Sequence, residues 1–159
     1  MKLYIKEKVF SWSDTFFVKD ELGNDKYTIE GEIFSLGKKL HVCDRHGAEV
    51  AFIKQELFTF LPQFTVSVGG AEVARVKREF SLFRPRYTIE GPGWDVEGSF
   101  WEHEYQITDN GRPIVTITKE WMTWGDSYEL DIADFVDEIL ALAVVLTIDC
   151  IKEQQNNNN

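Results

Sequence analysis

Apolar and polar residues alternate in short segments along most of the chain, from residue 2 to residue 131. Residues 64–68 read FTVSV and residues 105–108 read YQIT, so every second residue is apolar. A period of two places the apolar side chains of a strand on one buried face. About twelve such segments, separated by turn signals that combine Asp with Gly, predict an all-β sandwich or barrel.

Two kinds of repeat run through these segments. Residues 47–65 (GAEVAFIKQELFTFLPQFT) and 70–88 (GAEVARVKREFSLFRPRYT) are similar and lie 23 residues apart, and YTIEG occurs at 27–31 and again at 87–91. We expect the Tyr and Ile of each YTIEG copy to face the interior, the Glu to face solvent, and the Gly to let the strand bend. Because an active site is usually built once, the duplication indicates a repeated structural unit.

The last strand-like segment is followed by a predicted helix over residues 131–154, with Asp131 as its N-cap and Asp134 in a capping-box position. From Ile139 to Ile148 the helix carries no charge and is apolar on every side. Either a bilayer or a protein core could accept it. A bilayer is roughly 30 Å thick in its apolar part, whereas this run rises only about 15 Å. The pattern therefore favours a helix buried inside the protein.

A helix buried on every side must be surrounded by the strands that precede it. The predicted fold is mainly β: a closed antiparallel barrel of about twelve strands around its own hydrophobic C-terminal helix. A chain of 159 residues suits one such domain. We place the domain at residues 1–152 and expect residues 153–159, which end in NNNN, to be a disordered tail.

The chain also resembles a known family. The segment FFVKDELGNDKYTIEGEIFSLGKKLHVCDRHGAEVAFIKQELF (16–58) and the hydrophobic helix after SYELDI (127–132) are similar to the LURP-one-related family. That family belongs to the Tubby C-terminal-like superfamily, which includes the phospholipid scramblases. The pattern V-x-D, G-x-x-x-Y-x-I-E-G, G-x-x-L-H-V-x-D-x-x-G carries the resemblance, which extends from Met1 to about Lys152.

The resemblance implies a twelve-stranded barrel around a central C-terminal helix, in agreement with the pattern of the residues. It also implies a link to lipids, because Tubby domains bind phosphoinositides through basic side chains and scramblases are associated with calcium and lipid movement. Scramblases carry proline-rich and cysteine-rich segments outside the barrel. This chain has four prolines, two cysteines and no N-terminal extension, so we do not expect a scramblase, and we transfer no Tubby site residue to it.

The net charge of −10 argues against nucleic-acid binding and against general attraction to anionic lipid, although a local basic patch could still act. Alternation with Ala74 and Val76 points Arg75 and Lys77 outward, and Arg86 points outward beside Tyr87. The candidate anionic-ligand site is a basic stripe of Arg75, Lys77, Arg78, Arg84 and Arg86, with Lys38 and Lys39 as secondary candidates. It could hold a phosphate group; alternatively, Glu72, Glu79 and Glu90 pair with these cations on an ordinary solvated face.

Catalytic and metal-binding patterns are missing from the sequence. It has no GxSxG motif and no phosphate-binding glycine loop, so we expect neither an enzyme nor a cofactor. His41, Cys43 and His46 are close in sequence, but His46 falls in a turn and His103 is distant, so no metal site is predicted. The cysteines, Cys43 and Cys150, are expected to be reduced thiols of a cytoplasmic protein.

These features predict a cytoplasmic, non-enzymatic binding or scaffold module that docks at the membrane surface on anionic phospholipids such as phosphoinositides. The alternative is a protein–protein interaction module with no lipid role, which would use aromatic residues at the rim of the barrel. Trp94, Trp101, Trp121 and Trp124 could line an exposed ligand patch, although barrel core and rim positions explain most of them. Neither alternative includes a transmembrane segment or a nucleic-acid partner.

Overall fold

In the computed structural model, which describes residues 1–6, 15–32, 34–99, 104–122 and 125–157, a single antiparallel sheet is followed by one helix. The described part of the chain forms twelve strands, as predicted. The strands are β1 (Lys2–Lys6), β2 (Thr15–Lys19), β3 (Asp25–Gly31), β4 (Lys39–Asp44), β5 (Glu49–Gln55), β6 (Gln63–Val68), β7 (Ala71–Glu79), β8 (Arg86–Glu90), β9 (Asp95–Ser99), β10 (Glu104–Asp109), β11 (Arg112–Met122) and β12 (Gly125–Ile132). The helix is α1 (Glu138–Asn157).

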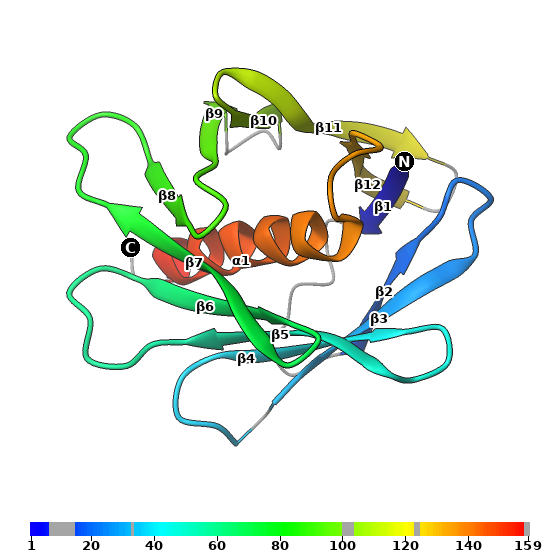
Figure 1. Ribbon diagram of the computed structural model, residues 1–159, viewed down its shortest axis with the longest axis horizontal. Helices are drawn as coiled ribbons and strands as arrows, with labels where there is room; N and C mark the ends of the chain where they lie inside the picture. The colour runs from blue at the N-terminus through cyan, green and yellow to red at the C-terminus, as the bar shows by residue number, and fades with distance from the viewer. Residues whose placement is uncertain (7–14, 33, 100–103, 123–124, 158–159) are drawn as a thin grey trace.

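The sheet curls around the helix and almost closes on itself (Figure 1). Consecutive strands pair in the order β8-β7-β6-β5-β4-β3-β2-β1-β12-β11-β10-β9, and β1 joins β12 with Leu3 opposite Leu130. The two outer strands, β8 and β9, do not form a ladder; within the described residues one isolated bridge joins Ile89 of β8 to Trp94, just before β9. The predicted barrel is therefore confirmed, and its seam lies between β8 and β9.

Alternate residues of most strands are buried and form the core around the helix. Both copies of YTIEG follow the prediction, because Tyr27 and Ile29 in β3 are buried, as are Tyr87 and Ile89 in β8. The two glycines differ. Gly31 stays in the ladder of β3, opposite Leu40. Gly91 has a φ of +100°, and a Cβ there would lie 2.2 Å from the carbonyl oxygen of Val73. Only the second glycine therefore ends its strand in a conformation that requires glycine.

The helix begins at Glu138, so the predicted N-cap at Asp131 is wrong. Asp131 still belongs to β12, where it lies opposite Lys2 and Thr116. The strand ladder, which the local sequence does not reveal, holds the backbone extended at this position. A short turn then follows, and the true N-cap is Asp137. Its Oδ1 accepts a hydrogen bond from the Leu140 N–H at 2.8 Å.

The helix is buried over most of its length, as its sequence predicted. Every residue from Ala141 to Lys152 is buried, and α1 contacts β5, β6, β7 and β12. No helix among the described residues is long and apolar enough to cross a membrane. The helix continues to Asn157, which is beyond Lys152, where we expected the domain to end.

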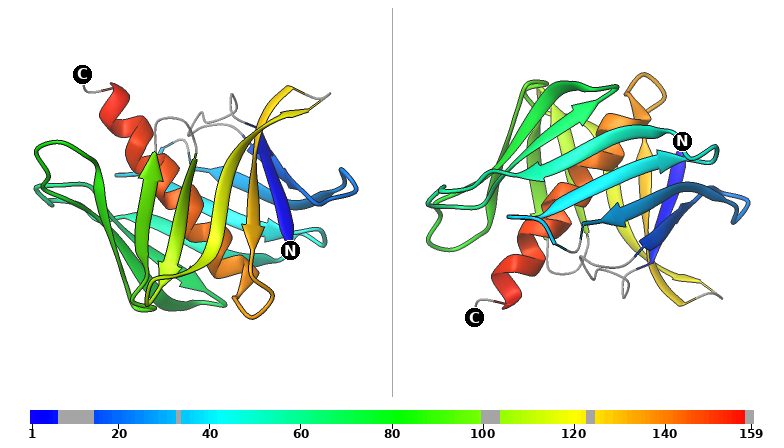
Figure 2. Two further views of the ribbon diagram at one scale, coloured as in Figure 1. Left: turned by 90° about the horizontal axis from the view of Figure 1, so that it is seen from above. Right: turned by 90° about the horizontal axis from the view of Figure 1, so that it is seen from below.

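The two ends of the barrel differ in their connections. At one end, here called the turn end, short turns at residues 20–24 and 45–48 join the strands, and Tyr27 donates a hydrogen bond to Glu138 at the start of α1. At the other end, here called the loop end, longer loops join β3 to β4, β5 to β6 and β7 to β8. The C-terminal end of α1 emerges at the loop end, which lies on the left in Figure 1; Figure 2 shows the helix passing through the barrel.

Candidate functional site

Three neighbouring loops at the loop end expose large apolar side chains to solvent. They connect β3 to β4, β5 to β6 and β7 to β8. We call eight of their side chains the apolar tips: Phe34, Leu36, Leu57, Phe58, Phe60, Phe80, Leu82 and Phe83. Soluble proteins rarely gather so much exposed apolar surface in one region, and such a patch marks an interaction site.

The stretches that carry the apolar tips contain no carboxylate; the acidic residues of these loops, Glu32 and Glu56, lie at the loop bases, where Lys39 and Arg75 pair with them. In residues 34–38, 57–62 and 80–85, the only charged residues are Lys38 and Arg84, although the whole chain holds 27 Asp and Glu residues. The turn at 20–24, at the opposite end of the barrel, carries two acidic residues. The apolar surface is therefore accompanied by positive charge, in a protein that is otherwise strongly acidic.

The internal repeat explains why two of the loops have the same form. The loops between β5 and β6 and between β7 and β8 are equivalent positions of the 23-residue repeat, so Phe60 matches Phe83 and Pro62 matches Pro85. Both phenylalanines are almost fully exposed, at 98% and 93%. The signal for this site is present in the sequence as apolar residues placed between two strands, but the predicted site does not include them, because the sequence alone does not show that they are exposed.

The backbone of Phe58 has an unusual conformation. Its φ is +62°, in the left-handed region that bulky side chains avoid, and its side chain is fully exposed. Asn110 is the other non-glycine residue in the described chain with a positive φ, and it lies in an Asn-Gly turn where this conformation is ordinary. Phe58 is thus held in an unfavourable backbone conformation without burying its ring against the described residues.

The bases of the loops are anchored to each other and to the helix. The Oε1 atom of Gln55 accepts hydrogen bonds from the Lys38 backbone N–H and from Nε2 of Gln154 in α1, both at 3.0 Å. The side chain of Leu57 lies close to Gly37 in the neighbouring loop. The apolar tips therefore project from a braced base.

Three of the seven predicted cations are balanced by carboxylates. Arg75 and Lys77 lie on the outer face, as predicted from alternation. Arg75 pairs with Glu56 at 3.0 Å and with Glu72 at 3.3 Å, and Lys77 pairs with Glu90 at 2.9 Å. In the same way, Lys39 lies 3.7 Å from Glu32. This part of the predicted stripe is a solvated face of ion pairs.

Two more of the cations surround the C-terminal end of α1. The guanidinium of Arg78 donates a hydrogen bond to Gln155 at 3.4 Å and lies 5.9 Å from the ring centre of Tyr87. Burial lowers the pKa of Lys38, and the nearby carboxylate of Glu153 opposes that shift only in part. Positive charge at this position complements the helix dipole, so both residues have a structural role.

The remaining two cations, Arg84 and Arg86, are exposed beside the apolar tips. Neither lies within 4.0 Å of a carboxylate of the described residues. In the ladder Arg86 lies opposite Glu79, whose carboxylate accepts a hydrogen bond from Thr88 at 2.9 Å. The predicted stripe is therefore not one continuous site. Of its cations, these two arginines, which lie next to Phe83, are the accessible ones.

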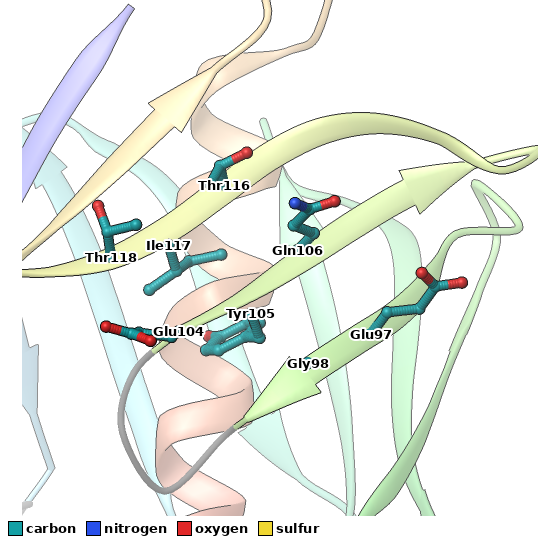
Figure 3. A pocket seen from close by; sticks show the side chains of 8 residues that line it. All are labelled: Glu97, Gly98, Glu104, Tyr105, Gln106, Thr116, Ile117 and Thr118. Carbon is teal, nitrogen blue, oxygen red and sulfur yellow. The ribbon is translucent and has the colours of Figure 1, made fainter.

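An open groove lies elsewhere, on the outer face of β9, β10 and β11. It has a volume of about 560 Å³ (Figure 3). Its lining residues are Glu97, Gly98, Glu104, Tyr105, Gln106, Thr116, Ile117 and Thr118. The charged groups of this lining are both carboxylates, so the groove disfavours an anionic ligand.

The histidine candidate for metal binding is held by carboxylates. His41 contacts Glu49 through Nδ1 and Glu32 through Nε2, the latter at 2.9 Å. Burial lowers the pKa of His41, but the two carboxylates outweigh it and raise the pKa overall. Among the described residues no group of three His, Cys, Asp or Glu side chains could hold a metal ion, and His103 lies outside them.

The tryptophans form no exposed ligand patch in the part of the chain that the structure describes. Trp94 is buried at the seam of the barrel, where it belongs to the core. Trp101 and Trp124 lie outside the described residues, and so does the side chain of Trp121. The exposed aromatic surface in the described part of the chain consists of phenylalanines, most of them at the loop end.

Comparison with known proteins gives matches over almost the whole chain. Residues 1–149 match the family described as LURP-one-related. The uncharacterized protein YxjI of Bacillus subtilis (strain 168) is 33% identical over 151 residues, which cover 95% of this chain and 93% of that protein. The X-ray structure of a protein from Arabidopsis thaliana has a similar fold, with a TM-score of 0.69, 17% identity, and coverage of 95% of this chain and 90% of that one.

Proposed function

The chain belongs to the LURP-one-related family, and for this member we propose a non-enzymatic binding module that docks its loop end on anionic phospholipids. In this proposal the protein is peripheral to the membrane. The apolar tips face the bilayer, and Arg84 and Arg86 contact lipid phosphates.

One observation carries the proposal: the loop end joins exposed apolar side chains to exposed, unneutralised arginines. Phe and Leu side chains on the apolar face of a peripheral membrane segment are buried at the boundary between head groups and acyl chains. Basic residues near an anionic leaflet gain roughly 1 kcal/mol each, and guanidinium groups form strong bidentate hydrogen bonds with phosphate. Arg84 and Arg86 border the tip residue Phe83, so both contributions act on the same side of the molecule.

The interior of the barrel supports a surface function. Helix α1 fills the space that an internal ligand would need, because its residues from Ala141 to Lys152 are buried against the strands. The groove over β9 to β11 is acidic, so it does not compete for an anionic ligand. The loop end therefore remains the best candidate for binding.

Vesicle co-sedimentation of the full chain tests this function. We expect the protein to pellet with phosphatidylcholine vesicles that contain phosphatidylserine or a phosphoinositide, and to remain in solution with pure phosphatidylcholine. The double variant Arg84→Glu, Arg86→Glu should lose binding. The matched double variant Arg75→Glu, Lys77→Glu alters cations that already have carboxylate partners, so it should reduce binding less.

The result that overturns the proposal is equally clear. If the wild-type protein does not pellet with any anionic vesicle at low salt, the loop end is not a lipid-docking surface. The apolar tips would then be assigned to the alternative, a protein–protein interaction module. In that case affinity purification from the native host should recover a stoichiometric partner, and its binding should survive the charge reversal of Arg84 and Arg86.

A further inference from the structure

We propose that the loop between β5 and β6, residues 56–62, penetrates the bilayer as a wedge led by Phe58. This inference rests on the proposed function and names the part of the loop end that enters the lipid. The loop inserts at the boundary between head groups and hydrocarbon in an anionic bilayer. The ring of Phe58 enters first, Phe60 follows it, and Arg84 of the next loop and Arg86 at the start of β8 stay at the level of the phosphates.

The conformation of Phe58 suits insertion into lipid. A φ of +62° favours glycine or asparagine at this position, and full exposure of a phenyl ring to water is also unfavourable. Both features raise the free energy of the folded protein in water. A lipid phase removes the second penalty, because it accepts the ring without any change in the loop. The conformation directs the ring away from the barrel, which suits insertion.

The shape of the loop end favours a bilayer over a partner helix. In Figure 1 the β5–β6 and β7–β8 loops project as separate hairpins beside the end of α1. A partner helix would require a concave apolar groove, whereas projecting tips can enter a fluid bilayer independently. The base of the wedge is fixed, since Leu57 is only 43% exposed and lies against Gly37.

The charge distribution of the β5–β6 loop also suits an anionic bilayer. Residues 57–62 contain no charged group, and the first acidic residue at the base of the loop is Glu56. Its carboxylate is already bound, because Arg75 pairs with it at 3.0 Å and the Gln63 amide donates a hydrogen bond to it. The negative charge nearest the wedge is therefore neutralised within the protein, and repulsion from anionic head groups is reduced.

The test combines binding with a measurement of depth. In Phe58→Gly the glycine accepts the positive φ, so the folded protein should become more stable to urea while its partition onto anionic vesicles falls about tenfold, the loss expected for one aromatic side chain. Leu22→Ser is the matched control. Leu22 is 86% exposed in the turn at residues 20–24, at the opposite end of the barrel, and its variant should bind as the wild type does.

Depth is measured with a fluorophore at position 58. In a Cys43→Ser background, where the remaining Cys150 is buried, Phe58→Cys carries an environment-sensitive label. We expect a blue shift on anionic vesicles and quenching by spin labels in the acyl chains. The same label on Leu22→Cys should show neither effect.

The outcomes separate this inference from the proposed function. If the wild type binds anionic vesicles but the label at position 58 is not quenched and Phe58→Gly binds like the wild type, the wedge is wrong. Docking through Arg84 and Arg86 would then still stand. If the wild type binds no anionic vesicle, both proposals are overturned together.

Discussion

Leu57 and Gly37 bring two neighbouring loops of the loop end into contact: a Cβ at position 37 would lie 2.9 Å from Leu57 Cδ2. Gly37 also has a φ of +76°. We predict that Gly37→Ala destabilises the protein by about 1–2 kcal/mol from the left-handed backbone alone, with a further loss as the Leu57 side chain is displaced. Urea unfolding gives the free energy of unfolding of both proteins.

Gly47→Ala provides the control for this prediction. Gly47 has a nearly equal φ of +81°, but nothing lies within 4 Å of a Cβ built there. Its variant should lose only the backbone contribution. Equal losses for the two variants would show that the contact between the loops does not contribute to stability.

A second prediction concerns the hydrogen bond between Tyr128 and Asp149 inside the barrel. Both residues are buried, and the Tyr128 hydroxyl donates to the carboxylate on α1. Burial and the charge of Asp149 raise the pKa of Tyr128 well above its usual value, so the hydroxyl remains a donor. Tyr128→Phe should lower the free energy of unfolding by about 1.5–3 kcal/mol, the range for hydrogen bonds to charged groups.

The matching control for that hydrogen bond is Tyr4→Phe. The Tyr4 hydroxyl donates to Glu129 at 2.8 Å, but this pair is only partly buried. Water can replace the lost donor at the surface, so the variant should lose about 1 kcal/mol or less. A smaller loss for Tyr128→Phe than for Tyr4→Phe would contradict the structural importance of the buried pair.

Much of the fold could be predicted from the sequence because its signals are local. The alternation of residues 64–68 places Phe64 and Val66 in the core, and most of the uncharged run from Ile139 to Ile148, from Ala141 onward, is buried in the structure. The helix start could not be located in the same way. Asp131 and Asp137 are both good N-cap residues, and only the pairing of β12 with β1 and β11 decides between them.

The candidate site could be predicted less well from the sequence than the fold. Whether a cation is free depends on which carboxylate lies beside it, and the register between neighbouring strands decides this. In the pairing of β7 with β8, Arg75 lies opposite Glu90, and Lys77 forms an ion pair with the carboxylate of Glu90. The exposure of the apolar tips could not be predicted either. Residues 57–61 read LFTFL, which has the composition of a buried strand, and only the position of the loop shows that these side chains are exposed.

A third prediction follows from the raised pKa of His41. Its ordinary pKa is 6.5, and the carboxylates of Glu32 and Glu49 raise the value in the folded state. The stabilisation from protonated His41 is therefore fully present below the unfolded-state pKa and is lost as the pH rises through the folded-state pKa. The wild type should exceed His41→Gln in stability at mildly acidic pH, and the difference should shrink at alkaline pH.

Urea unfolding of the two proteins across this pH range checks the sign. His46→Gln is the control, because His46 lies exposed in a turn. It makes the same His-to-Gln change at a position outside the contacts with Glu32 and Glu49. If the stability difference for His41→Gln increased with pH, protonated His41 would not be the favoured form in the folded protein.

The position of the N-cap gives a fourth prediction. Asp137→Ala removes the acceptor of the Leu140 N–H and should lower the free energy of unfolding by about 1 kcal/mol, within the range for capping residues. Asp131→Ala changes an exposed residue of β12 and should alter stability by less than about 0.5 kcal/mol. The reverse order in a thermal or urea unfolding experiment would place the functional cap at Asp131.

The last prediction concerns the middle of the helix. Ala143 has no exposed surface and lies in the part of α1 that the strands surround. Ala143→Asp would place a carboxylate in the core, where an unpaired charge destabilises a protein by several kcal/mol. Because whole domains are stable by only about 5–15 kcal/mol, we expect the variant to lose its cooperative unfolding transition. Ala71→Asp, at an exposed position of β7, introduces the same carboxylate and should remain folded. If Ala143→Asp gave a monomeric protein with an intact near-UV circular dichroism spectrum, α1 would not be the core of the barrel.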